Sequence, residues 1–253
     1  MIREHRCIRC GACLDTCAEG AISQVGDAVR TNLEKCTVCG DCVEACQTKA
    51  REIVGREMTV DQVIAEIERD TPFYDESHGG VTFSGGEPLM QAPFLIELLR
   101  ACRGRDIHAA VDTTGLANSK TIAEAAEYAS LFLYDVKMID DARHVKYTGV
   151  SNELILQNLR VLSRDGRNIV VRVPLIPGIN DDDANMDALA EFVLSLSHVP
   201  PVSLLPYHKA GADKYTRLGK SYALAGTEPP TDARVAELAE RLGRAGLAVR
   251  IGG

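Results

Sequence analysis

Residues 7–17 read CIRCGACLDTC, and residues 36–46 read CTVCGDCVEAC. Each cysteine of the first stretch lies 29 residues before its counterpart in the second, so this segment is an internal duplication. Eight of the nine cysteines of the chain fall in these two stretches. The spacing C-x2-C-x2-C-x3-C places three thiols on one tight loop and a fourth farther along the chain. We therefore predict a separate cysteine-rich module at residues 1–55.

This spacing resembles that of bacterial two-cluster ferredoxins, in which three cysteines of a run hold one [4Fe–4S] cluster and the fourth reaches the other. Proline usually follows the last cysteine, whereas Ala18 and Gln47 stand here. Two alternatives stay open. A pair of zinc ribbons would need only two C-x2-C pairs, and a disulfide framework would fit a secreted protein. The ferredoxin resemblance implies cluster I on Cys7, Cys10, Cys13 and Cys46, and cluster II on Cys36, Cys39, Cys42 and Cys17.

The composition is typical of a globular protein. The 253 residues suffice for one barrel-sized domain and a small module, with 45% hydrophobic and 25% charged residues. No apolar run approaches the ~20 residues that span a bilayer, and residues 1–6 lack the apolar core of a signal peptide. A net charge of −8 argues against nucleic acid as the main partner. We expect a soluble, cytoplasmic protein that binds neither membranes nor nucleic acid.

Residues 56–253 alternate between strand and helix patterns, beginning with a capping-box spacing at Thr59–Gln62. This alternation predicts right-handed crossovers and a parallel sheet, so the second domain is of the α/β class. The predicted strands are 80–84, 107–112, 130–135, 168–173, 200–205 and 248–251. The predicted helices after the first are 91–103, 119–129, 152–164, 183–196 and 231–245.

Five successive predicted strands end in polar motifs. They are SGGEP (84–88), DTTG (112–115), YDVK (134–137), RVPLIPGIND (172–181) and LLPYH (204–208). Taken singly, paired glycines are usually a turn, Asp135 with Lys137 is a plain ion pair, and His208 is a packing or surface histidine. The carboxyl edge of parallel strands is, however, where barrel enzymes place their active sites. Five such motifs at one edge favour a shared site.

In this order the motifs resemble those of the glycyl radical enzyme activating enzymes, which are radical-SAM oxidoreductases. The YTGVSN stretch (147–152) and the closing VRIGG (249–253) fit the same family, so the resemblance covers residues 7–253. It implies a partial parallel (β/α)6 barrel, and the branch concerned inserts a two-cluster ferredoxin module. It also implies reductive cleavage of S-adenosylmethionine (SAM) at a [4Fe–4S] cluster, which generates a glycyl radical on a partner enzyme under anaerobic conditions.

The resemblance also implies roles for individual residues. The bare main chain at Gly85 and Gly86 would bind the SAM amino group, and Lys137 and Arg172 would lie near its carboxylate. The implied SAM-binding set is Gly85, Gly86, Glu87, Asp135, Val136, Lys137, Arg172 and His208. The implied monovalent-cation set is Asp112, Thr113 and Asp135. We expect the other histidines to be structural: His5, His78, His108, His144 and His198.

The family motif for the SAM-ligating cluster, C-x3-C-x2-C, does not occur in these residues. After Cys17 and Cys46 the required third cysteine is replaced by Gly20 and Lys49. The ninth cysteine, Cys102, lies in a predicted helix and is expected to be inert. The first barrel strand is also missing, which would leave an unpaired sheet edge.

We therefore expect an N-terminally truncated, impaired form of an activating enzyme without its catalytic cysteines. A short paralogue and a partner chain that supplies the missing piece are the alternatives. The short paralogue would be a non-catalytic iron–sulfur electron-transfer or docking protein with a relic SAM site. A third, SAM-ligating cluster is expected only in a full-length protein.

The resemblance implies two kinds of protein partner. One is a glycyl radical enzyme, whose glycine loop enters the barrel mouth, and the other is a reduced flavodoxin or ferredoxin. Insert-bearing activators serve enzymes acting on diols, choline, isethionate, hydroxyproline or aromatic acids, whereas the simpler formate-lyase activator lacks the insert. We expect partner specificity to reside in surface segments 141–150 and 209–214.

Overall fold

A computed structural model of the chain describes residues 1–211, 215 and 221–252. The chain divides into two compact units. The first comprises Met1–Glu57 with the described residues of His208–Gly226, and the second comprises Met58–Tyr207 with the described residues from Thr227 on. None of the described helices is long and apolar enough to cross a membrane.

The N-terminal module repeats the sequence duplication in its backbone. The short elements are η1 (Glu4–Arg6), α1 (Ala12–Asp15), β1 (Ile22–Val25), β2 (Ala28–Thr31) and α2 (Asp41–Glu44). In the antiparallel pairing of β1 with β2, Ile22 lies opposite Thr31, and an isolated bridge pairs Ile2 with Arg51. Ile22 and Arg51 are 29 residues apart, as are Ile2 and Thr31. The second pairing is therefore the duplicated copy of the first.

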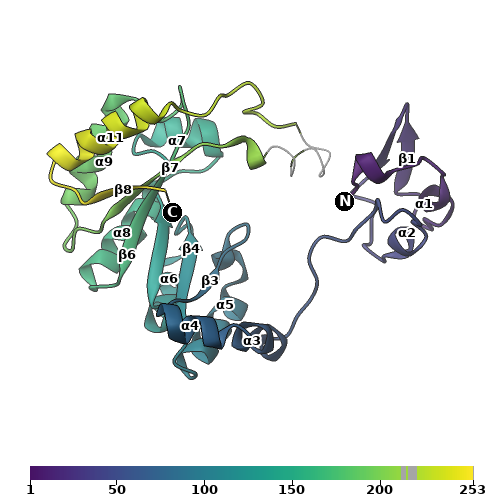
Figure 1. Ribbon diagram of the computed structural model, residues 1–253, viewed down its shortest axis with the longest axis horizontal. Coiled ribbons are helices and arrows are strands. Elements are labelled where there is room, and N and C mark those ends of the chain that lie inside the picture. The colour runs from purple at the N-terminus through teal and green to yellow at the C-terminus, as the bar shows by residue number, and fades with distance from the viewer. Residues whose placement is uncertain (212–214, 216–220, 253) are drawn as a thin grey trace. The chain divides into compact units, whose positions relative to one another are not determined.

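The second unit is built on a six-stranded parallel sheet whose strands follow one another in sequence order (Figure 1). This arrangement confirms the predicted parallel α/β fold. Since all strands run the same way, the loops that follow them emerge at a single edge of the sheet. The strands are β3 (Gly80–Phe83), β4 (His108–Thr113), β5 (Leu131–Asp135), β6 (Ile169–Leu175), β7 (Val202–Pro206) and β8 (Val249–Ile251).

Helices precede the sheet and join its strands. The helix α3 starts with a reciprocal capping box, in which Thr59 Oγ1 accepts from the Gln62 N–H (3.3 Å) and Gln62 Oε1 accepts from the Thr59 N–H (2.9 Å). The helices are α3 (Val60–Glu68), α4 (Thr71–Ser77), η2 (Pro88–Gln91), α5 (Ala92–Arg103), α6 (Ser119–Tyr128), α7 (Asp141–Thr148), α8 (Glu153–Arg164), α9 (Asp183–Leu194) and α11 (Asp232–Arg244). A short turn, η3 (Lys209–Gly211), follows β7.

The two faces of the sheet differ in chemistry. Along β6, Ile169, Val171, Val173 and Leu175 are buried in the core shared with the helices. Arg172 lies between them in the sequence and therefore projects from the opposite face, since successive strand residues alternate. Hydrophobic burial thus fixes the register of the strands, and it assigns charged side chains to the face away from the core helices.

Candidate functional site

The loop after β3 brings two bare glycines to the carboxyl edge of the sheet. Gly85 has a φ of +134°, which L side chains rarely adopt, and an added Cβ at Gly85 or Gly86 would meet no atom within 4 Å. Both residues are exposed. The main chain is accessible here to a polar ligand group, which is the feature that the predicted backbone contact requires.

Glu87 ties this loop to the end of β4. Its Oε1 accepts from the Thr113 hydroxyl (2.6 Å) and the Leu89 N–H (3.2 Å). Its Oε2 accepts from the Thr114 N–H (2.9 Å) and the Thr114 hydroxyl (2.7 Å). Four donors therefore converge on one carboxylate. Glu87 belongs to the predicted SAM-binding set. In the structure its carboxylate also holds the loops after β3 and β4 together.

The turn after β4 depends on a glycine. Thr113 is buried, and its Oγ1 accepts from the Gly115 N–H (2.8 Å). Gly115 has a φ of +73°, and a Cβ there would lie 1.7 Å from Tyr134 Oη. The Tyr134 hydroxyl donates to the Ile155 carbonyl oxygen (2.7 Å), and burial raises the pKa of Tyr134, so the phenol stays a neutral donor. This packing fixes the end of β4 beside Glu87.

A second cluster lies on the face of the sheet away from the core helices. Arg172 of β6 donates from Nε (2.9 Å) and Nη2 (2.8 Å) to Asp135 Oδ1 of β5, and it also contacts Asp112 of β4. Lys137 Nζ lies 3.6 Å from Asp135 Oδ2. Burial lowers the pKa of Arg172, but the charges of Asp135 and Asp112 outweigh this effect and raise it above its usual value. Two carboxylates and two cations thus share one site.

The structure separates the residues of the predicted cation set. Asp112 and Asp135 share Arg172, whereas the adjacent Thr113 directs its hydroxyl to Glu87. In the part of the chain that the structure describes, Asp112 and Asp135 do not join a third His, Cys, Asp or Glu side chain in a metal-binding arrangement. The monovalent-cation site therefore remains a prediction.

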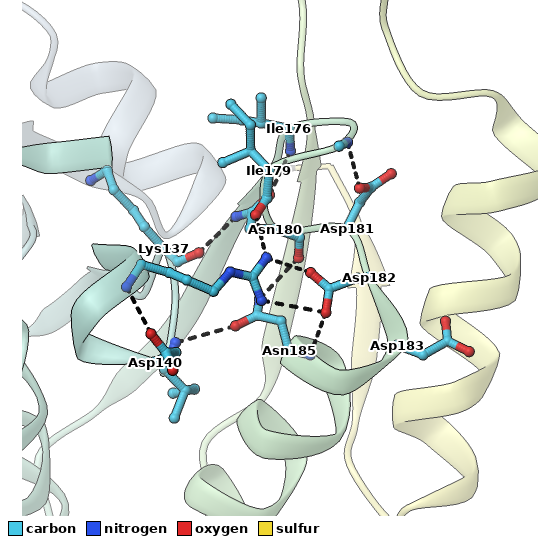
Figure 2. A network of polar contacts seen from close by, with 12 residues as sticks. Lys137, Asp140, Ile176, Ile179, Asn180, Asp181, Asp182, Asp183 and Asn185 are labelled. Atoms are coloured by element: carbon cyan, nitrogen blue, oxygen red, sulfur yellow. Dashed lines mark hydrogen bonds and ion pairs between the residues drawn. The ribbon is translucent and has the colours of Figure 1, made fainter. Parts of the chain in front are cut away.

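Two buried asparagines brace the loop that carries Lys137 (Figure 2). Asn180 Nδ2 donates to the carbonyl oxygens of Lys137 (2.7 Å) and Pro174 (2.7 Å). Asn185 Nδ2 donates to the Asn180 carbonyl oxygen (2.9 Å), and its Oδ1 accepts from the Ile139 N–H (3.2 Å). The loops after β5 and β6 therefore form one hydrogen-bonded unit. Asn180 belongs to the motif RVPLIPGIND (172–181), but the sequence pattern does not indicate this bracing role.

Two predicted SAM-binding residues lie apart from the cluster of charges. Val136 is buried in the hydrophobic core, and its N–H donates to the Arg172 carbonyl oxygen (2.9 Å). Any ligand contact of Val136 would therefore use its backbone. His208 follows the end of β7 by two residues and belongs to the first unit, so its SAM contact stays a prediction. Of the predicted specificity segment 209–214, residues 212–214 lie outside the described part of the chain.

Two cavities in the first unit are lined by the cysteines of the duplicated runs. One is lined by Cys7, Cys10, Cys13 and Cys46, and the other by Cys17, Cys36, Cys39 and Cys42. All nine cysteines are free thiols, so the structure contains no disulfide framework. The cavities divide the eight module cysteines into the two sets that the ferredoxin resemblance implies. The assignment of these sets as cluster ligands remains a prediction.

The backbone around the thiols suits sulfur ligands of a cluster. The Ala21 N–H donates to Cys17 Sγ (3.3 Å), and the Ala50 N–H donates to Cys46 Sγ (3.2 Å) at the duplicated position. Burial raises the pKa of Cys46, but hydrogen bonds from the Thr48 side chain and from backbone groups outweigh it and lower the pKa. A thiolate is the form that binds iron.

The cysteine loops impose the same backbone turns in both copies. Left-handed φ values are uncommon outside glycine. Here they recur at matched positions 29 residues apart, whatever the residue: Arg9 (59°) with Val38 (58°), Gly11 (80°) with Gly40 (97°), and Gly20 (55°) with Lys49 (51°). The loop shape is therefore a property of the cysteine spacing rather than of individual side chains.

Comparisons with protein families agree with this architecture. The family model described as "Radical SAM superfamily" matches residues 44–190, and the model described as "4Fe-4S dicluster domain" matches residues 6–50. Together these matches assign iron–sulfur clusters and SAM as the cofactors. They favour iron–sulfur clusters over the zinc alternative for the cysteine module.

Similar proteins and structures narrow the family. The chain is 43% identical to a trans-4-hydroxy-L-proline dehydratase activating enzyme of Clostridioides difficile, over 100% of this chain and 84% of that protein. It is 40% identical to a choline trimethylamine-lyase activating enzyme of Oleidesulfovibrio alaskensis, over 92% of this chain and 77% of the relative.

A solved domain of a pyruvate-formate lyase-activating enzyme from Bacteroides vulgatus is 38% identical to this chain, with a TM-score of 0.60. The match covers 69% of this chain and 99% of the solved chain. A radical SAM methyltransferase from Sphaerobacter thermophilus (20% identity, TM-score 0.58) shares the fold. The chain belongs to the glycyl radical enzyme activating enzymes of the radical SAM superfamily.

Proposed function

We propose that the chain provides the SAM-binding edge and two accessory clusters of an enzyme that generates a glycyl radical on a partner protein. The observation that supports this most is the group of charges on β4, β5 and β6, together with the exposed Gly85–Gly86 main chain in the loop after β3. SAM carries an ammonium and a carboxylate on its methionine group. The strand ends offer a complementary set of carboxylates, cations and bare backbone.

Each residue then has a defined task. The accessible main chain at Gly85 and Gly86 binds the ammonium group, and Asp112 and Asp135 supply carboxylates for a monovalent cation beside the SAM carboxylate. Lys137 and Arg172 hold the SAM carboxylate, with Asn180 bracing the Lys137 loop. When bound, SAM and its [4Fe–4S] cluster supply the reductive bond cleavage that yields 5′-deoxyadenosine. The protein orients SAM and excludes water from it.

The cysteines of this chain do not account for that third cluster. Eight of nine lie in the module, and Cys102 in α5 is fully buried. Burial raises the pKa of Cys102, which keeps it a thiol. We therefore propose that these 253 residues alone cleave SAM poorly or not at all. The module clusters would relay electrons from a reduced flavodoxin or ferredoxin when a SAM-ligating cluster is supplied.

The same cysteine count favours a second candidate function. In this alternative the chain is an iron–sulfur electron-transfer or docking protein, and its SAM site is a relic. Both candidates predict about eight irons per chain. They differ in SAM binding, since a relic site has no need to keep the affinity that Lys137 provides. SAM cleavage by the chain would exclude the second candidate.

Equilibrium dialysis with labelled SAM tests the proposal directly. Lys137→Met is expected to lower SAM affinity at least tenfold, because a hydrogen bond to a charged group contributes roughly 1.5–3 kcal/mol. The matched control is Lys146→Met, which removes an exposed lysine on α7. Both variants should retain the iron content of the wild type. Equal SAM affinity in wild type and Lys137→Met would refute the site assignment.

A further inference from the structure

Arg51 is a buried cation in the cysteine module. Only 4% of the Arg51 surface is exposed to solvent. Nη1 donates to the Thr31 hydroxyl (2.9 Å), whereas Nε and Nη2 are buried without a hydrogen-bond partner among the described residues. Buried charged donors without an acceptor cost several kcal/mol. These two guanidinium nitrogens, which carry three N–H groups, therefore call for an acceptor that the described residues do not provide.

The position of Arg51 indicates what this acceptor is. Arg51 is one of the residues that line both cysteine cavities. Thiolate and sulfide sulfur atoms of a [4Fe–4S] cluster are hydrogen-bond acceptors with negative charge. They satisfy the two free donors and compensate the buried charge.

The duplication shows that this cation is specific to one half of the module. The counterpart of Arg51, 29 residues earlier, is Ile22, which lines the second cavity as an apolar side chain. The two residues occupy the same place in the duplicated strand pairing: Ile22 lies opposite Thr31, and Arg51 lies opposite Ile2. At this duplicated position the module therefore carries an apolar side chain in one copy and a fixed positive charge in the other.

We propose that Arg51 donates hydrogen bonds from Nε and Nη2 to one of the two module clusters, whose cavities it lines, and thereby makes that cluster the first of the two to accept an electron. Reduction adds one electron and no proton to a cluster that already carries four thiolates. A fixed cation stabilises the added negative charge and raises the reduction potential. The inference requires only the two module clusters, so its failure would leave the proposed SAM site untouched.

An EPR-monitored anaerobic titration with dithionite or Ti(III) citrate as electron donor tests this assignment. The wild type should show two one-electron steps. Arg51→Met should lower the equilibrium constant of the higher-potential step at least tenfold, which is about 59 mV for one electron. Arg51→Lys, which keeps the charge but changes the donors, should lower it less. Arg6→Met removes an exposed cation of the same module that lines neither cavity, and should shift neither step by as much as threefold.

A second measurement does not depend on the folding of any Arg51 variant. Arg9 and Arg30 are the other arginines that line these two cavities, and both side chains are about half exposed. In an Arg9→Lys/Arg30→Lys chain labelled with arginine that carries 15N only in the guanidinium group, pulsed EPR of the first reduced cluster should show 15N coupling from Arg51. Absence of this coupling, or equal shifts in Arg51→Met and Arg6→Met, would overturn the proposal.

Discussion

At the scale of single residues, neighbouring positions on β4 serve opposite faces of the sheet. Asp112 contacts Arg172 on the face of charges, and Thr113 donates to Glu87 from its buried position. The alternation of a strand makes this division inevitable, because successive side chains point to opposite sides. The adjacent residues of the motif DTTG therefore have different roles. Asp112 belongs to the charged site, and Thr113 helps to hold the strand-end loops in place.

The role of Glu87 leads to a prediction about stability as well as binding. Glu87→Gln places an amide N–H₂ against donors from Thr113 or Thr114, so at least one hydrogen bond to a charge is lost. We expect a loss of about 1.5–3 kcal/mol in the free energy of unfolding, measured by urea denaturation. SAM affinity should fall as well.

Glu97→Gln, which changes an exposed carboxylate on α5, is the control for this experiment. Its effect should be below about 0.5 kcal/mol, as is usual at surface positions. Equal stability of the two variants would mean that the four hydrogen bonds of Glu87 do not hold the loops together.

The sequence could name the charged residues of the site but not all their contacts. The sequence leaves open that Asp135 and Lys137 form a plain ion pair, and Lys137 Nζ lies 3.6 Å from Asp135 Oδ2. The sequence does not reveal the bracing role of Asn180. This role depends on hydrogen bonds to the carbonyl oxygens of Lys137 and Pro174, which are far apart in the sequence. Motifs predict which chemistry gathers at an edge, whereas long-range hydrogen bonds appear only in the fold.

At the scale of elements, the sequence pattern predicts the helices that bury a stripe of apolar side chains against the sheet. The prediction 91–103 corresponds to α5 (Ala92–Arg103), and 231–245 corresponds to α11 (Asp232–Arg244). Neither α4 nor α7 was predicted as a helix. The physical reason is that α4 buries no residue and α7 buries only His144, so neither has an apolar stripe to detect. The predicted surface segment 141–150 therefore contains a helix.

The start of α9 offers a test of how one element is anchored. Asp182 is its N-cap and accepts from the Asn185 N–H (3.0 Å) and from Arg143 Nη2 (2.6 Å). The hydrogen bond from Arg143 is the main cause that lowers the pKa of Asp182. A lowered pKa in the folded state stabilises the fold above the unfolded carboxyl pKa, and this contribution is lost as the pH falls through the folded pKa.

We therefore expect a pH-dependent effect of substitution at Asp182. Asp182→Ala removes cap and charge and should cost about 0.5–2 kcal/mol at pH 7. Asp182→Asn keeps the cap acceptor and should cost less, with its deficit disappearing in acid. Urea unfolding of the second unit, followed by circular dichroism from pH 7 down to pH 3, measures both. If the loss of stability in Asp182→Asn did not change with pH, the ion pair between Arg143 and Asp182 would be contradicted. The control is Asp75→Asn, which changes an exposed carboxylate in α4.

At the scale of the whole molecule, the chain combines a duplicated cluster module with a parallel sheet whose polar edge resembles a SAM site. Identity to relatives does not by itself select the partner. A pyruvate formate-lyase-activating enzyme of Staphylococcus epidermidis is 40% identical over 72% of this chain, close to the 43% of the relative from C. difficile. The module is the more informative feature, because the resemblance associates it with one branch of the family.

The partner class gives the last prediction. A variant extended at its N-terminus by a strand that carries C-x3-C-x2-C would supply the SAM-ligating cluster that Cys102 cannot provide. After anaerobic mixing with SAM, reductant and a candidate glycyl radical enzyme, EPR should show a glycyl radical with a partner of the insert-bearing branch and none with formate-lyase. The unextended chain is the control and should give at most a trace. A signal with formate-lyase alone would show that the cluster module does not mark the partner class.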